Sequence, residues 1–218
     1  MSARPALLFD LDGTLADSAV MIAQALSQLA LSRGGAAVEV ERARRLVSKG
    51  ASTLVREALG PSATDSDADL LAFRTILAGI RAEPSVIFPG VIDALETLTA
   101  TGHACAVVTN KPEGLSRLLL DQLDLARFFG AVVGGDTLTV CKPDPMPLRH
   151  ALKALGVEGQ PALMIGDSGI DASAAAAAGL AFLLFEGGYE AESCRPEDVG
   201  ASFGSFAQLP ALVSATAV

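Results

Sequence analysis

The stretch LLFDLDGTL, residues Leu7–Leu15, joins a short apolar run to two aspartates, a glycine and a threonine. Apolar runs of this length that end in turn-forming residues are typical of buried strands. Asp10 and Asp12 therefore stand at the end of a predicted buried strand, where their negative charges repel each other. A bound cation relieves that repulsion, and hard oxygen ligands of this kind suit Mg²⁺. A turn that only ends the strand is the alternative interpretation.

The overall composition narrows the class of protein. The chain has 218 residues, 50% of them hydrophobic, which allows one large domain or a domain with an insert. Its formal net charge of −9 disfavours nucleic acid as a partner, because phosphate backbones attract basic surfaces. Three irregularly spaced cysteines argue against a disulfide framework and against a zinc site.

The sequence also carries expectations about location. The N-terminus shows no basic segment followed by a long apolar one, which argues against a signal peptide. No apolar stretch reaches the roughly 18–20 residues that span a bilayer. We therefore expect a soluble, cytoplasmic protein with no membrane partner, and the choice between a monomer and a homodimer stays open.

Further apolar runs alternate with helical patterns along the chain. Strands are predicted at Ala104–Val108, Ala131–Val133, Ala162–Ile165 and Ala181–Phe185. Helices are predicted at about Gly90–Ala100, Glu113–Leu123, Pro145–Leu155 and Gly169–Ala178. This alternation indicates an α/β fold with a Rossmann-like parallel sheet that helices cover on both faces.

The segment after the opening motif is different, because it contains amphipathic runs and no strand-like run. Helices are predicted there at Ser18–Leu31, Val40–Val47, Ser52–Leu59 and Ala68–Ile80. We expect residues 17–85 to form a helical cap domain, inserted into a core that consists of residues 1–16 and 86–218.

Polar side chains suited to chemistry follow the predicted strands. The first strand is followed by Asp10 and Asp12, the second by Thr109 and Asn110, the third at a short distance by Lys142, and the fourth by Asp167 and Asp171. Ligands of open α/β sheets bind outside the carboxyl ends of the strands. Helix capping is an alternative role for Thr109-Asn110 and for Asp167 or Ser168, and Lys142 alternatively is an exposed loop cation. Their joint occurrence at strand ends favours one shared site.

That set of residues suits phosphoryl transfer, which needs neutralised charge, held phosphate oxygens and an in-line nucleophile. Mg²⁺ between Asp10 and Asp167 would neutralise a phosphate together with Lys142. Thr109 would hold phosphate oxygens. An aspartate is left as the nucleophile, and carboxylates act in this way through an aspartyl-phosphate.

These residues resemble the four signature motifs of the haloacid dehalogenase superfamily of phosphatases. The motifs are Asp10–Thr14, Thr109 at the end of an apolar strand, Lys142 in Lys-Pro-Asp-Pro, and Gly166-Asp167 with Asp171. They occur in the family's order across the predicted sheet domain. The helical insert lies where the family has a cap that closes over the substrate.

The resemblance implies a role for each matching residue. Asp10 would be the nucleophile, and Asp12 would protonate the leaving alcohol and then activate water. Mg²⁺ would be held by Asp10, Asp167 and the backbone carbonyl of Asp12. Asp171 would be an additional metal ligand or a group behind the ligands. The phosphoryl group would be bound by Thr109, Asn110 and Lys142.

Within the superfamily the core is most similar to phosphoglycolate phosphatases. The similar stretches are Val108-Thr109-Asn110-Lys111-Pro112, Val133-Gly134-Gly135-Asp136, Lys142-Pro143-Asp144-Pro145 and Phe88-Pro89-Gly90-Val91. The resemblance implies Mg²⁺-dependent hydrolysis of a small phosphorylated metabolite, 2-phosphoglycolate in particular. Lys49, in a turn of the predicted cap, is a candidate for binding the substrate carboxylate, with a solvated lysine as the alternative.

Other functions stay open on sequence alone. The substrate is alternatively a sugar phosphate or another small ester, and a phosphosugar mutase shares the same motifs. A receiver-like phosphoacceptor domain is disfavoured because it places its acceptor aspartate after the third strand, where this chain has Gly134-Gly135. A degenerate binding protein is disfavoured because none of the required side chains is missing.

Overall fold

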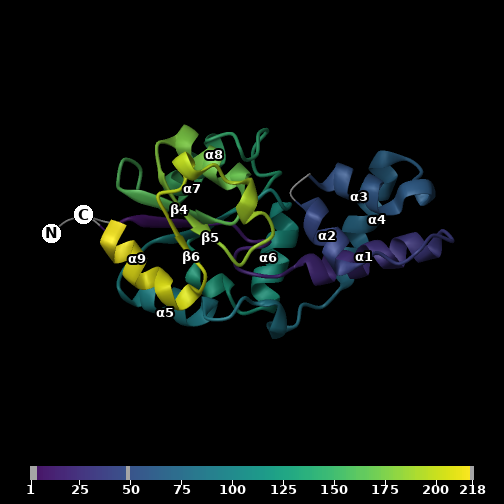
Figure 1. Cartoon of the computed structure of the whole chain (residues 1–218), viewed down its shortest axis with the longest axis horizontal. Coiled ribbons are helices and arrows are strands. Elements are labelled where there is room, and N and C mark those ends of the chain that lie inside the picture. The colour runs from purple at the N-terminus through teal and green to yellow at the C-terminus, as the bar shows by residue number, and fades with distance from the viewer. Residues whose placement is uncertain (1–3, 48–49, 217–218) are drawn as a thin grey trace. The chain divides into compact units, whose positions relative to one another are not determined.

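The computed structural model describes residues 4–47 and 50–216. They form two compact units, one made of the described residues up to Ala16 together with those from Ile87 onward, and one made of Asp17–Val86. Figure 1 shows a sheet with its helices in the first unit and helices in the second. The predicted α/β core with a helical insert is confirmed.

The core unit is built on a six-stranded parallel sheet with the order β3-β2-β1-β4-β5-β6. The strands are β1 (Ala6–Phe9), β2 (Cys105–Val108), β3 (Ala131–Val133), β4 (Ala162–Gly166), β5 (Ala181–Phe185) and β6 (Ala201–Phe203). All four residues of β1 are buried, as expected for a strand covered on both faces. The opening motif therefore leaves the sheet near its middle.

Helices cover both faces of this sheet. They are α5 (Val91–Ala100), α6 (Glu113–Gln122), α7 (Met146–Ala154), α8 (Gly169–Ala178) and α9 (Leu209–Thr216). Helices α7 and α8 contact each other on one face, and α5 and α9 contact each other on the other (Figure 1). The alanine-rich α8 lies against β4 and β5, because small side chains let its backbone come close to the sheet.

The second unit contains α1 (Ala19–Ser32), α2 (Val40–Val47), α3 (Ala51–Leu59) and α4 (Ser66–Gly79). Helix α4 begins after an aspartate that caps it, because the Asp65 carboxylate accepts hydrogen bonds from the backbone N–H groups of Asp67 and Ala68. None of the helices that the structure describes has the length and apolarity that a bilayer crossing requires.

Candidate active site

The opening motif is shaped by a glycine. Gly13 has a φ of +88°, and a Cβ at this position would overlap the Asp167 carboxylate and the Tyr189 ring. Because the backbone passes so close to Asp167, the Thr14 hydroxyl reaches it and donates a hydrogen bond of 3.0 Å. The motif after β1 is thereby attached to the end of β4.

Lys142 lies at the centre of the candidate site, although it comes from a loop far along the chain. Its ammonium donates to Oδ1 of Asp10 at 2.8 Å and to Oδ1 of Asp171 at 2.6 Å, and only 2% of its side chain is exposed. The Asn110 side chain holds the backbone of this lysine from both sides. It accepts from the Lys142 N–H at 3.0 Å and donates to the Lys142 carbonyl at 2.9 Å.

The two aspartates after β4 have separate hydrogen-bond partners. Asp167 accepts from the Thr14 hydroxyl and, at 2.7 Å, from the Tyr189 N–H. Asp171 accepts from the Ser168 hydroxyl at 2.7 Å and from the Ser168 N–H at 3.2 Å, which completes a capping box at the start of α8. Asp171 is therefore part of both the helix start and the contact with Lys142.

Three carboxylates in this site are able to hold a divalent cation. Asp10, Asp167 and Asp171 each offer one oxygen, and these oxygens lie within 4.8 Å of one another. Burial raises the pKa of Asp10 to about 6, against the opposing effect of the Lys142 ammonium. Burial also raises the pKa of Asp167 well above its ordinary value, and the charges of Asp10 and Asp171 add to that rise.

Burial is the main cause of these pKa shifts, and the site contains little positive charge to oppose it. Lys142 is the ammonium shared by Asp10 and Asp171, and both carboxylates raise its pKa against the effect of burial. One such charge does not balance three buried carboxylates, and the hydrogen bonds that Asp167 accepts from the Thr14 hydroxyl and the Tyr189 N–H come from neutral donors. A hard divalent cation with oxygen ligands fits this set of donors.

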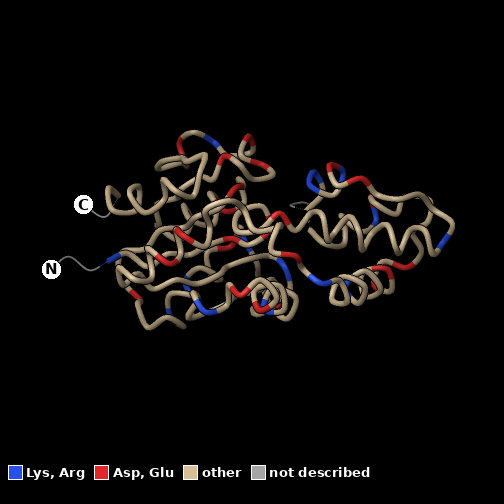
Figure 2. The backbone as a smooth tube through the Cα atoms, turned by 90° about the horizontal axis from the view of Figure 1, so that it is seen from below, with Lys and Arg blue, Asp and Glu red and all other residues tan. Residues whose placement is uncertain are grey.

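A second lysine contacts the other aspartate of the opening motif. The Lys111 ammonium lies 3.2 Å and 3.1 Å from the two carboxylate oxygens of Asp12. The side chains are 8% and 11% exposed. The chain as a whole is acidic, and its charged residues are scattered along the backbone (Figure 2). The two lysine contacts thus place positive charge locally at the strand ends.

Thr109 ends β2 as predicted and is buried. Its N–H donates to the Val133 carbonyl at 2.9 Å, and its hydroxyl accepts from the Lys111 N–H at 3.2 Å. The structure therefore brings Asp10, Lys142, Asp167 and Asp171 together. Lys49 lies outside the described residues.

Sequence reasoning assigned no role to three residues that contact the predicted ones, namely Thr14, Lys111 and Tyr189. Lys111 stands in a stretch that carries the family resemblance, so a signal for it was present. The hydrogen bond from Ser168 to Asp171 is recognisable as a capping box three residues apart. The contact between Thr14 and Asp167 spans 153 residues and has no local signal.

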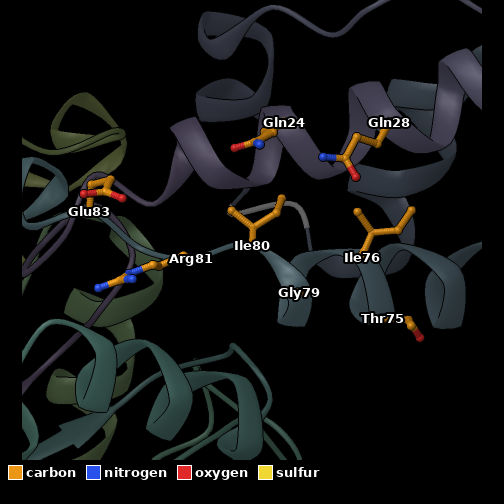
Figure 3. A pocket seen from close by; sticks show the side chains of 8 residues that line it. All are labelled: Gln24, Gln28, Thr75, Ile76, Gly79, Ile80, Arg81 and Glu83. Carbon is orange, nitrogen blue, oxygen red and sulfur yellow. The ribbon is translucent and has the colours of Figure 1, made fainter.

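A pocket of about 600 Å³ lies in the helical unit, and none of the aspartates described above lines it. Figure 3 shows Gln24 and Gln28 on α1 facing Ile76 and Ile80 at the end of α4. The remaining lining residues are Thr75, Gly79, Arg81 and Glu83. Most of them are exposed, which describes an open surface groove rather than a closed cavity.

Comparisons with known proteins agree with this geometry. The family model described as haloacid dehalogenase-like hydrolase matches residues 7–185. A phosphoglycolate phosphatase of Rhodospirillum rubrum is 40% identical over 214 residues, which cover 94% of this chain and 88% of the relative. A phosphoglycolate phosphatase of Pseudomonas fluorescens is 39% identical over 189 residues, covering 84% of this chain and 70% of the relative.

Solved structures share the whole architecture. A crystal structure of a predicted phosphoglycolate phosphatase from Haemophilus somnus superposes with a TM-score of 0.83 at 25% identity, covering 97% of this chain and 99% of that one. The parallel sheet, its acidic strand ends and the helical insert together make an α/β architecture with a candidate metal site. The chain belongs to the haloacid dehalogenase-like hydrolases.

Proposed function

We infer that this enzyme is a Mg²⁺-dependent phosphatase that hydrolyses a small phosphate monoester through an aspartyl-phosphate, with 2-phosphoglycolate as its substrate. The inference rests above all on the Asp10 carboxylate, which lies beside the buried Lys142 ammonium and within the acidic cluster. Relatives named phosphoglycolate phosphatase, at 39% and 40% identity over most of the chain, support the choice of substrate.

The proposed reaction has two steps, and both use Asp10 and Asp12. A carboxylate oxygen of Asp10 attacks phosphorus, the ester P–O bond breaks, and Asp12 gives a proton to the leaving alcohol oxygen. Asp12 then takes a proton from water as that water attacks the aspartyl-phosphate. Breaking the acyl phosphate P–O bond releases inorganic phosphate and restores the Asp10 carboxylate.

Phosphate charge in this scheme is neutralised by residues at the strand ends. Lys142 moves part of its hydrogen bonding from Asp10 to the phosphoryl oxygens, and the Thr109 hydroxyl binds another oxygen. The Asn110 side chain is already bonded to the Lys142 backbone. We therefore assign it to positioning Lys142.

Asp10, Asp167 and the backbone carbonyl of Asp12 would hold the metal ion. When bound, Mg²⁺ supplies positive charge that neutralises the phosphate and the carboxylates. Asp171 has hydrogen-bond donors on both carboxylate oxygens, Lys142 on one and Ser168 on the other. The contact of Asp171 with the Lys142 ammonium, together with its bonds to Ser168 at the start of α8, favours a role behind the ligands in which Asp171 orients Lys142.

Release of inorganic phosphate from a panel of esters tests the proposed function. The panel contains 2-phosphoglycolate, sugar phosphates and pyrophosphate, each with Mg²⁺ and with EDTA. We expect 2-phosphoglycolate to have the highest kcat/KM. Preference for a sugar phosphate would overturn the substrate, and isomerised phosphosugar without free phosphate would overturn the reaction type in favour of a mutase.

A further inference from the structure

The contact between Lys111 and Asp12 has no evident structural purpose. Both side chains are close to buried, and the ammonium faces both carboxylate oxygens at 3.1–3.2 Å. Removing two opposite charges from water can cost more free energy than their mutual attraction returns. A buried ion pair is therefore weak evidence for a role in stability. Its partner is the proposed proton carrier, which points to a function in the reaction.

The backbone of Lys111 is fixed at two points. Its N–H donates to the Thr109 hydroxyl at 3.2 Å, and its carbonyl accepts from the Gly135 N–H at 2.9 Å. Its side chain can still rotate, and it is long enough for the ammonium to move from one anion to another. Lys142, by contrast, is held between Asp10 and Asp171 and serves the phosphoryl end.

The chemistry of the proposed substrate supplies that second anion. In 2-phosphoglycolate, the ester oxygen and the carboxylate are attached to the same carbon atom. Asp12 must contact the ester oxygen to protonate it. An ammonium that contacts Asp12 is therefore already near the position of the substrate carboxylate.

We propose that Lys111 is a specificity-determining residue that binds the carboxylate of an α-carboxylated alkyl phosphate. This proposal rests on the proposed phosphatase function. Without substrate, Lys111 holds the Asp12 carboxylate. The substrate carboxylate takes over the ammonium, and Asp12 is released toward the leaving oxygen. An alkyl phosphate without a carboxylate cannot make this exchange and leaves Asp12 paired with Lys111.

Two substrates that differ only in the anion test the proposal. One is 2-phosphoglycolate, and the other is 2-hydroxyethyl phosphate, in which a hydroxymethyl group replaces the carboxylate. In Lys111→Met we expect kcat/KM for 2-phosphoglycolate to fall by roughly 10- to 100-fold, the scale of one hydrogen bond to a charged group. The value for 2-hydroxyethyl phosphate should be unchanged or higher, because Asp12 is no longer held.

Matched variants separate charge from side-chain size. Lys111→Arg should keep the preference for the carboxylated substrate. Lys153→Met removes an exposed lysine from α7 and should change neither value. If Lys111→Met does not fold, Lys111→Gln serves the same comparison with a polar side chain of similar reach.

The outcomes distinguish this proposal from the proposed function. Equal loss on both substrates would mean that Lys111 acts only through Asp12, and no loss on either would remove it from the site. Both results overturn the proposal and leave phosphatase activity in place. Failure of the wild-type enzyme to release phosphate from any ester would instead overturn the proposed function.

Discussion

Buried aspartates occur in both units of this protein, in opposite electrostatic situations. Asp69 of the helical unit accepts from Arg33 at 2.6 Å and from the N–H and hydroxyl of Thr64 at 2.8 Å and 2.7 Å. Although burial raises its pKa, these partners outweigh burial and lower it. Asp10 and Asp167 of the core unit are also buried, but their pKa values are raised.

The difference separates a carboxylate whose surroundings suit a role in the fold from carboxylates whose surroundings suit the proposed chemistry. Asp69 has a charged partner of its own and closes a loop between two helices. The core aspartates share one ammonium and remain short of positive charge, so they gain from a bound metal ion. Strongly perturbed carboxylates in such surroundings are characteristic of functional sites.

Exchanging the charge for an amide in each unit should have opposite results. Asp10→Asn should lower turnover by roughly 10⁴-fold or more, as expected when a nucleophile is lost, without lowering the melting temperature. Asp69→Asn should keep kcat and lose about 1–3 kcal/mol of stability, because the Arg33 charge loses its partner. Phosphate release and thermal unfolding measure both. Near wild-type turnover by Asp10→Asn would refute Asp10 as nucleophile.

Removal of the metal ion should stop the reaction, because the aspartates proposed to bind the ion lie in the core unit. EDTA should abolish turnover, and Mg²⁺ should restore it, because Asp10 and Asp167 then regain a neutralising charge. The same titration followed by thermal unfolding should show that Mg²⁺ stabilises the wild-type protein more than Asp10→Asn. Turnover that is indifferent to both EDTA and Mg²⁺ would exclude the metal from the mechanism.

Removal of the proton carrier should be less severe than removal of the nucleophile. Asp12→Ala should lose roughly 10²–10⁴-fold in kcat with an alkyl phosphate, the scale of general acid–base catalysis. With p-nitrophenyl phosphate the first step should be nearly normal, because that leaving group needs no proton. A burst of nitrophenol followed by slow turnover would show this, and an equal loss of both steps would contradict it.

Asn110 allows the positioning role to be separated from direct phosphate binding. Asn110→Ala removes both hydrogen bonds to the Lys142 backbone, each worth about 1 kcal/mol, and should lower kcat by roughly 10-fold. KM should change little if the residue acts through Lys142. A rise in KM alone would instead indicate direct contact with substrate.

The smallest expected effect is a pH dependence of stability with opposite sign in the two units. The lowered pKa of Asp69 contributes stability above its ordinary value of 3.8, and this is lost as pH falls through the lowered pKa. The raised pKa of Asp10 means the reverse, so stability without metal falls as pH rises from 3.8 to about 6.

Melting temperatures in EDTA measure this contrast. The advantage of wild type over Asp69→Asn should shrink as the solution is acidified below about pH 4. The advantage of Asp10→Asn over wild type should grow between about pH 4 and pH 6. The same trend in both variants would contradict the assigned charges.

Much of this structure could be predicted from local patterns. Five strands were located because short apolar runs end in turn residues, and their polar successors meet at one sheet edge because the strands are parallel. Strand β6 and helix α9 were missed. The three residues Ala201–Phe203 are too short for a periodic signal, and the apolar residues of α9 have only weak helical patterning.

Pairings inside the site were beyond sequence reasoning. The sequence does not show which carboxylates Lys142 binds or that Lys111 binds Asp12. These pairings depend on how far side chains reach between strands that are far apart in the chain. Asn110 has the right location for contact with phosphate, but its amide is used on the Lys142 backbone. Residue type and strand-end position predict membership of the site and leave the division of tasks undetermined.

The backbone at the boundary of the helical unit has an evolutionary consequence. Ala16 and Ile87 form an antiparallel bridge, and the Phe88 N–H donates to the Leu15 carbonyl at 3.1 Å. The core unit therefore holds both ends of the inserted segment side by side. Since loop closure costs only about 0.6 kcal/mol more for each doubling of length, the segment between them is replaceable as a module. Lineages can exchange it for a shorter or longer one while the catalytic sheet stays unaltered.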